Sequence, residues 1–286
     1  MSILGRIGRK GGSQMAIITI SRQLGSLGTE IAQGAAEKLR YEYVDKKRIE
    51  QALSNYGVLP PEVEKFDEKK PSFWDIFLLQ KKRFLHSLEA VIYDLARKGN
   101  LVIVGRGGQV LLRYLPGVLH VRIIAPFDIR VKRIMAAEGG DEKKATRTLN
   151  RSDRDSAGFL RSFFEVDWED QTLYDLMINT EKLVAETGVN LIVQSISSPE
   201  IQEGGKATEA KLADLALSQK VEVLLMGILG IGFGNVSVLV KGGIVSLSGQ
   251  VTSETLKEDI MLAVKKIEGV KEVVCQFNIV PLTYPA

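Results

Sequence analysis

Short runs of β-forming residues alternate with amphipathic segments over the first two thirds of the chain. The β-forming runs lie at residues 16–20, 101–105, 118–125 and 175–179. Between them, apolar residues recur at helical spacing, as at Ile31, Ala35 and Leu39, and the long segment 73–98 has the same character. Apolar strands separated by helices predict a parallel sheet that is covered on both faces, which is an α/β fold.

The pattern changes after residue 196. Residues 196–210 are polar and include a proline and a glycine pair, which predicts an interdomain linker. Two alternating strands follow at 236–240 and 244–251, then an amphipathic helix that ends at Gly269 and a last alternating strand. This rhythm is typical of a small α+β domain. We therefore expect an α/β domain at 15–197, a linker at 198–208 and an α+β domain at 209–283.

Composition narrows the class of protein. The chain of 286 residues is long enough for two domains, and its net charge of +3 is too small to indicate binding to DNA or RNA. A single cysteine, Cys275, rules out an internal disulfide and fits a cytoplasmic protein. The most apolar stretch, 221–234, is too short to span a membrane, and the leader before Met15 has no signal-peptide core.

The stretch SRQLGSLGTE, residues 21–30, lies between a strand and a helix. Gly25, Ser26 and Gly28 allow backbone N–H groups to meet phosphate oxygens at the positive end of the helix, and Thr29 stands where a magnesium-binding hydroxyl is expected. The phosphate loop G-x-x-x-x-G-K-[ST] has a lysine where this chain has Gly28. By itself, such a turn is more often a plain connection than a phosphate site.

Arginines are grouped in two later segments. Arg106 follows the strand LVIVG, at the end of a parallel sheet where ligands bind. Arg147, Arg151 and Arg154 share one face of a predicted helix, which suits a lid that closes over phosphates. The spacing alone leaves equal room for a solvated helix whose arginines pair with neighbouring aspartates.

Five motifs occur together and in order: ITISRQLGSLGTEIA, YVDKKRIEQAL, VIVGRGGQVLL, APFDIRVKRIM and RSDRDSAGFLRSFFEVDWEDQTLYDLMINT. With them the first domain resembles the cytidylate-kinase-like family of P-loop nucleoside monophosphate kinases. The resemblance implies phosphoryl transfer from ATP, with Mg²⁺, to a nucleoside monophosphate, CMP or dCMP first. It also implies which residues form the site. The ATP phosphates would be bound by Gly25, Ser26, Gly28 and Thr29, and Thr29 would also bind the metal. The acceptor would be bound by Asp45 and Arg106, and the charge in transfer would be stabilised by Arg151 and Arg154.

Two positions depart from that resemblance. True cytidylate kinases carry a lysine in the first loop and an aspartate after the Gly-Arg pair, where this chain has Gly28 and Gly107. A single preorganised donor is worth ~3 kcal/mol of barrier, so we expect Arg22, just before the loop, to reach the same oxygens. The alternative is a nucleotide-binding pseudokinase that regulates the tail domain. A third alternative is a scaffold that recruits partners or membranes.

The tail sequence from 236 to 280 resembles the BON domain, chiefly in IVSLSGQV after a glycine turn and in GVKEV. The resemblance implies binding of a phospholipid or a small ligand, and the oligomeric state stays open. Cys275 alternates with apolar residues and is expected to be a core thiol, and His86 and His120 are expected to have packing roles. Trp168 is expected to approach the nucleotide.

Overall fold

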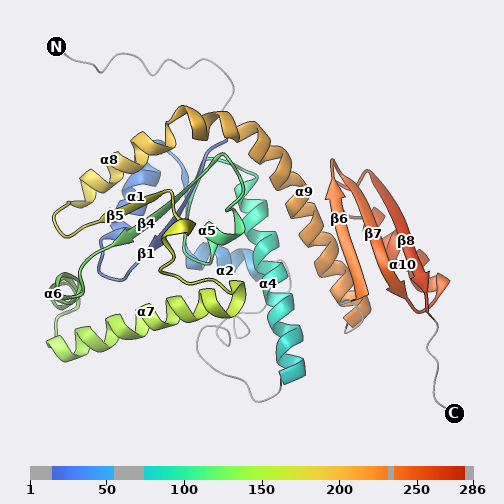
Figure 1. Ribbon diagram of the computed structural model, residues 1–286, viewed down its shortest axis with the longest axis horizontal. Helices are drawn as coiled ribbons and strands as arrows, with labels where there is room; N and C mark the ends of the chain where they lie inside the picture. The colour runs from blue at the N-terminus through green and yellow to red at the C-terminus, as the bar shows by residue number, and fades with distance from the viewer. Residues whose placement is uncertain (1–14, 55–73, 231–234, 281–286) are drawn as a thin grey trace.

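A parallel sheet of five strands organises the first domain. The computed structural model describes residues 15–54, 74–230 and 235–280. The strand order is β2-β3-β1-β4-β5 (Figure 1). The strands are β1 (Ile17–Arg22), β2 (Glu42–Val44), β3 (Leu101–Val104), β4 (Val118–Ile124) and β5 (Leu176–Asn179). The predicted α/β class is confirmed.

Helices cover both faces of this sheet, as expected for strands that are apolar on both sides. In β1, Ile18 and Ile20 pack toward α1 (Gly28–Leu39) and α8 (Ala185–Ile196). Ile17 belongs to the cluster on the opposite face, which includes residues of α2 (Lys46–Ser54), α4 (Trp74–Ala96) and α5 (Gly108–Leu111). The period of two along β1 thus divides the core into two layers.

The carboxyl ends of the strands lie at one edge of the sheet, and a long helix runs along that edge. The loop after β1 leads through α1 toward β2, whereas the loop after β4 leads through α6 (Phe127–Glu138) toward β5. Helix α7 (Glu142–Phe164) crosses this edge (Figure 1). Neighbouring strands whose loops leave in opposite directions form a crevice where α/β proteins bind ligands.

The expected linker at 198–208 is not an irregular segment. Residues Pro199–Leu229 form one continuous helix, α9. A Cβ on Gly204 would lie 2.4 Å from the carbonyl carbon of Pro116, so this glycine lets the helix pack tightly against the loop before β4. The Thr208 hydroxyl accepts a hydrogen bond from the Gly117 amide at 2.8 Å. Gly204, one of the glycines that suggested a linker, therefore serves close packing, and the domain boundaries remain predictions.

The tail is a three-stranded sheet with two helices, which confirms the predicted α+β class. Strands β6 (Val236–Lys241) and β7 (Ile244–Val251) are antiparallel, and β8 (Glu272–Ile279) pairs in parallel with β7 after the crossover helix α10 (Glu254–Lys265). Helix α9 supplies the other helix and lies between the two sheets (Figure 1). Among the described residues, no helix is both long and apolar enough to cross a membrane.

Candidate functional site

The loop between β1 and α1 turns sharply and is held by its own buried serine. Gly25 and Leu27 both adopt the left-handed conformation, with φ of 76° and 60°. The fully buried Ser26 hydroxyl is within donating distance of two carbonyl oxygens, at 2.8 Å from Gln23 and 3.2 Å from Ile123. The Ser26 amide also donates to Gln23. Ser26 thus holds the loop in shape.

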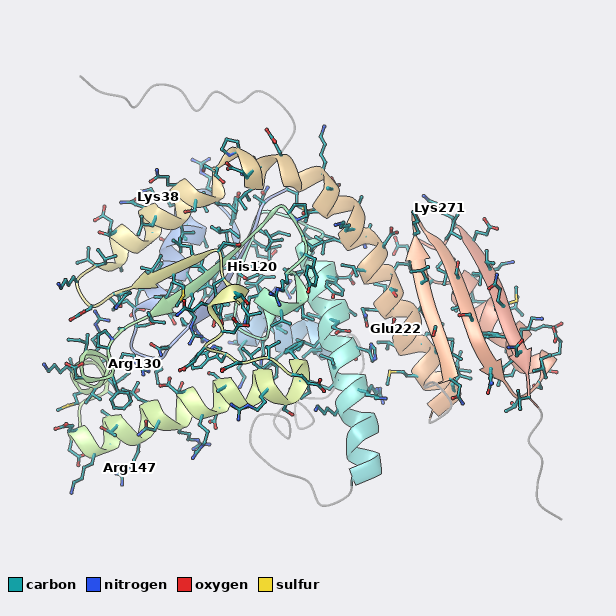
Figure 2. All side chains as sticks on the ribbon, in the orientation of Figure 1. Lys38, His120, Arg130, Arg147, Glu222 and Lys271 are labelled. Carbon is teal, nitrogen blue, oxygen red and sulfur yellow. The ribbon has the colours of Figure 1, made fainter. Side chains whose placement is uncertain are left out.

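Three side chains that the sequence reading missed bind the loop carbonyls from behind. Arg130 and Arg133, on α6, donate to the carbonyl oxygens of Leu24 and Gly25 at 3.4 Å and 3.2 Å. The Thr180 hydroxyl donates to the carbonyl of Ser26 at 2.9 Å. The motif APFDIRVKRIM carried the signal, because two arginines one helical turn apart follow a buried strand. Figure 2 labels Arg130 where α6 approaches α7.

This arrangement fits an anion on the other side of the loop. In a planar trans peptide, an N–H group points opposite to the carbonyl of the preceding residue, so the Gly25 amide faces away from Arg130 and the Leu27 amide faces away from Thr180. Helix α1 begins with no side-chain cap, which leaves its first N–H groups for a ligand. Thr29 is exposed in that first turn. The donor set suits phosphate, and the Thr29 hydroxyl suits Mg²⁺.

Arg22 occupies the space beside Gly28. A Cβ at position 28 would lie 2.4 Å from the Cβ of Arg22 and 2.8 Å from its Cγ. The same side chain extends toward β3, because its Nη1 would lie 3.5 Å from a Cβ on Gly105. The structure therefore shows why position 28 is a glycine: a larger residue there would collide with Arg22.

Arg22 is a half-buried cation at the edge of the sheet. Burial lowers the pKa of Arg22; Tyr43 opposes this effect and the nearby Arg106 adds to it. The guanidinium keeps its charge at neutral pH because the unperturbed value is so high. Within residues 15–54, 74–230 and 235–280, Arg22 has no ion pair. A half-buried positive charge next to an uncapped helix N-terminus is well placed for an anionic ligand.

Arg106 is held between α2 and α7. Its guanidinium donates to Glu50 of α2 at 3.0 Å and lies 5.4 Å from the ring centroid of Phe159 of α7. The next residue, Gly107, adopts φ 74°, and a Cβ there would lie 2.3 Å from the ring of Phe164. A side chain at position 107 would therefore collide with Phe164 of α7.

Helix α7 brings the lid arginines to the same edge. Arg151 and Arg154 are exposed, and Arg151 lies 3.6 Å from Asp155. Asp153 does not pair with these arginines; it accepts two hydrogen bonds from the buried Arg130, at 3.0 Å and 2.8 Å. Since Arg130 also binds the first loop, this bidentate pair fixes α7 beside that loop. The pairing expected for a solvated helix holds for Asp155 alone.

Two expectations about single residues change with the structure. The Asp45 carboxylate accepts the Arg48 amide at 2.9 Å and so caps the start of α2, a structural role beside its expected role at the acceptor. Trp168, expected to approach the nucleotide, is instead buried in the core. Its indole N–H donates to Ser21 at 2.9 Å, and the Arg122 guanidinium stacks 3.8 Å from its ring centroid.

The histidines and the cysteine pack against the protein, as expected. His120 is buried and lies 2.7 Å from the Thr19 hydroxyl through Nδ1, and burial lowers its pKa. Cys275 is half-buried in the tail core, where burial raises the pKa of its thiol. His86 contacts α9 rather than the site edge.

Comparison with known proteins agrees with this geometry. Residues 17–182 match the sequence model of the cytidylate kinase-like family, and these residues are more than half of the chain. The chain belongs to the cytidylate kinase-like family. Residues 214–281 match the model of the BON domain. Both family resemblances read from the motifs are confirmed.

Individual relatives match about two thirds of this chain. A cytidylate kinase of Natronomonas pharaonis is 28% identical over 204 residues, which are 68% of this chain and 96% of that protein. A cytidylate kinase of Methanocaldococcus jannaschii is 25% identical over 64% of this chain and 98% of that protein. An uncharacterized protein from Eubacterium ventriosum has a similar fold, with a TM-score of 0.51 and 24% identity over 64% of this chain and 99% of that chain.

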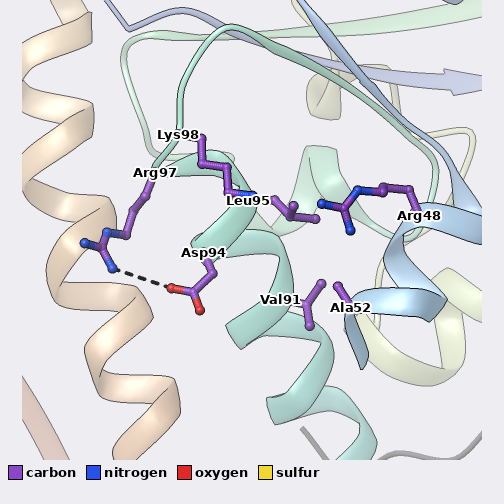
Figure 3. Close-up of a pocket in the computed structure, with 7 residues that line it drawn as sticks. All are labelled: Arg48, Ala52, Val91, Asp94, Leu95, Arg97 and Lys98. Atoms are coloured by element: carbon purple, nitrogen blue, oxygen red, sulfur yellow. Dashed lines mark ion pairs between the residues drawn. The ribbon is translucent and has the colours of Figure 1, made fainter. Parts of the chain in front are cut away.

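A separate cavity of about 440 Å³ lies between α2 and α4. Its rim carries Arg48, Arg97 and Lys98, and Figure 3 shows the ion pair of Arg97 with Asp94. Arg48 is likewise paired, with Glu42 at 3.3 Å. The cavity lies near the start of β3, at the opposite end of that strand from Arg106, so we do not assign it to the loop site.

Proposed function

We propose that the first domain transfers a phosphoryl group from ATP to a nucleoside monophosphate, with CMP or dCMP as the first candidates, in the cytoplasm. The observation that carries this proposal is the position of Arg22. Its side chain fills the space beside Gly28, where a phosphate loop has its lysine, and it has no ion pair within the described residues. Arg22 thus supplies the cation that the loop sequence lacks.

The proposed reaction needs positioning and charge rather than a general base. A phosphate oxygen of the acceptor attacks the γ-phosphorus of ATP, the bond from that phosphorus to the bridging oxygen breaks, and ADP leaves. The acceptor is already an anion, so no proton has to be removed. The loop amides and Arg22 hold the donor phosphates, Arg106 orients the acceptor, and Arg151 and Arg154 stabilise the charge in transfer. Mg²⁺ at Thr29 would neutralise phosphate charge.

The test is a turnover assay with ATP, Mg²⁺ and a panel of nucleoside monophosphates. ADP and the new diphosphate are followed by chromatography for the natural chain, Arg22→Ala and Arg22→Lys. We expect turnover with a preference for one monophosphate, and a loss of about 10²–10³-fold in kcat for Arg22→Ala, since one preorganised donor is removed. Arg22→Lys keeps the charge and retains part of the rate.

The control for this test is folding. Arg22→Ala must keep the thermal unfolding midpoint of the natural chain within a few degrees for the comparison to count. Full activity in a folded Arg22→Ala protein would show that another group replaces the lysine, and the proposal for Arg22 would be wrong.

A second function is favoured by one contact. Glu50 neutralises Arg106, and Phe159 of α7 covers it, so the acceptor residue is engaged by the protein itself. We therefore propose as the alternative a nucleotide-binding regulator whose state controls the tail domain and its phospholipid or small ligand. ATP binding by calorimetry without turnover on any monophosphate would support this function over the enzyme.

A further inference from the structure

Helix α9 belongs to the cores of both domains. Leu212 and Ala216 are fully buried in the cluster that covers one face of the first sheet. Leu217, Val221 and Leu225 are buried in the core of the tail. The Asp214 carboxylate also accepts the amides of Gly242 and Gly243, at the turn between β6 and β7. The tail sheet is therefore fixed to α9, and its place beside the first domain depends on how α9 packs against α4 and against the loop before β4.

Polar groups gather where α4 and α9 meet. His86 of α4 lies 2.8 Å from Glu222 and 2.8 Å from the side-chain oxygen of Gln219, both on α9. Glu89 of α4 lies 3.5 Å from the same ring nitrogen of His86. The side chains of His86, Glu89 and Glu222 are 21%, 17% and 16% exposed. Figure 2 labels Glu222 on the side of α9 near α4.

These neighbours change the proton affinity of the cluster. Burial alone would lower the pKa of His86, but hydrogen bonds with Glu222 and Gln219 and the charges of Glu222 and Glu89 outweigh it, so the pKa is raised. Burial raises the pKa of Glu89 to about 7; His86 opposes this and Glu222 adds to it. Burial and the two carboxylates also raise the pKa of Tyr93.

Both shifts act in the same direction on the contact. A group whose folded pKa is raised stabilises the folded contact below its unfolded pKa and loses that contribution as the pH rises through the folded value. For Glu89 the loss extends from about 4.5 to about 7. For His86 it begins near 6.5 and continues above it. Once both His86 and Glu89 have lost their protons, the two carboxylates of Glu89 and Glu222 face a neutral imidazole.

We propose that His86, Glu89 and Glu222 form a proton-operated clasp that holds α9, and with it the tail domain, against α4 and loosens as the pH rises through neutrality. The Lys220–Asp94 ion pair at 3.1 Å joins the same two helices and limits how far they separate. Helix α4 also contacts α7, because Phe84 of α4 packs against Phe163 of α7 with ring centroids 5.3 Å apart. The proposal does not depend on the kinase activity.

The test is hydrogen exchange of the full chain between pH 6 and 8, with each rate divided by the intrinsic exchange rate at that pH. We expect the protection of peptides from α4 and α9 to fall by about ten-fold or more over this range, from Glu89 alone. Peptides from α1 and α8 serve as an internal reference and should keep their protection. The variants are Glu89→Gln and, as a matched control on exposed α9 surface, Glu209→Gln.

The outcomes separate the clasp from a merely structural contact. Glu89→Gln should lose most of the pH dependence while α4 and α9 stay protected, and Glu209→Gln should keep it. His86→Gln, which preserves a hydrogen bond to Glu222, should lose the part of the pH dependence above pH 6.5 that comes from His86 rather than from Glu89. Constant protection of α9 in the natural chain across the range would overturn the proposal. So would a Glu89→Gln variant with the full pH dependence of the natural chain.

Discussion

At the scale of single residues, the two glycines that depart from the kinase pattern are explained by side chains from elsewhere. Gly28 leaves the space that the Arg22 side chain fills, and Gly107 leaves the space that the Phe164 ring fills. Neither position is simply an empty place where a functional residue was lost. Each glycine is one half of a pair, so its substitution should be judged together with its partner.

The first pair gives a direct prediction. Gly28→Lys restores the lysine of the phosphate loop but collides with Arg22, and we expect a loss of about 2 kcal/mol in the free energy of unfolding from overpacking. The double variant Arg22→Gly/Gly28→Lys should recover part of this loss, because it removes both the Cβ and the Cγ of Arg22 that the new side chain would meet. Urea denaturation of the single and double variants measures the coupling.

Gly158 on α7 is the matched control for this experiment, because a Cβ there meets no atom within 4 Å. Gly158→Lys should not lower the free energy of unfolding, and it should raise it by about 0.5 kcal/mol because lysine favours the helix interior more than glycine does. If the double variant were as unstable as Gly28→Lys alone, the collision with Arg22 would not be the cause.

At the scale of elements, α7 is a helix with two kinds of face. Its arginines are exposed, as expected of a lid, but its other side is fixed at two points. Asp153 pairs with Arg130 behind the loop, and Phe163 packs with Phe84 of α4. The helix therefore closes over the sheet edge as a part of the fold rather than as a loose flap.

The anchor at Asp153 can be tested by its removal. Asp153→Ala leaves the Arg130 guanidinium, which is 4% exposed, without its carboxylate, and we expect a loss of about 3 kcal/mol in stability. Asp155→Ala is the control, since the Asp155–Arg151 pair is exposed and worth about 0.5 kcal/mol or less. Thermal unfolding of both variants measures the difference, and equal losses would contradict the anchoring role.

At the scale of the whole molecule, α9 makes the two domains structurally dependent on each other. The family match of the first domain ends at residue 182 and the BON match begins at residue 214, yet Leu212 and Ala216 complete the core of the first domain. The tail is therefore not a module on a flexible tether, and its ligand would act on a body that is packed against α4.

Two matched leucines of α9 test this dependence. Leu212→Ala should destabilise the first domain by about 3 kcal/mol through a cavity in its core, and Leu225→Ala should act mainly on the tail. Hydrogen exchange of peptides from β3 and from β7 reports on each domain separately. Equal effects of both variants on β3 would contradict the division of α9 into two faces.

The sequence by itself determined both families and most of the elements, although it did not reveal β2 or the continuous helix α9. Apolar strands, helical periodicity and ordered motifs are local signals, so they placed β1, β4 and β7 and identified both domains before any contact was known. They also named Arg22, Arg106, Arg151 and Arg154 as candidates, whose roles remain predictions.

Only the tertiary structure decided which groups meet. Arg130, Arg133 and Thr180 bind carbonyl oxygens of a loop that lies more than a hundred positions away in the sequence. No spacing rule reveals these contacts. Gly204 was interpreted as part of a linker because glycine is common both in turns and where elements pack closely, and only its contact with Pro116 shows which applies here. The sequence also did not reveal that Trp168 lies in the core, because its partners Ser21 and Arg122 come from strands that are distant in the sequence. Residue type and spacing can be read from the chain itself, whereas the burial of a side chain and the identity of its partners depend on how the chain folds.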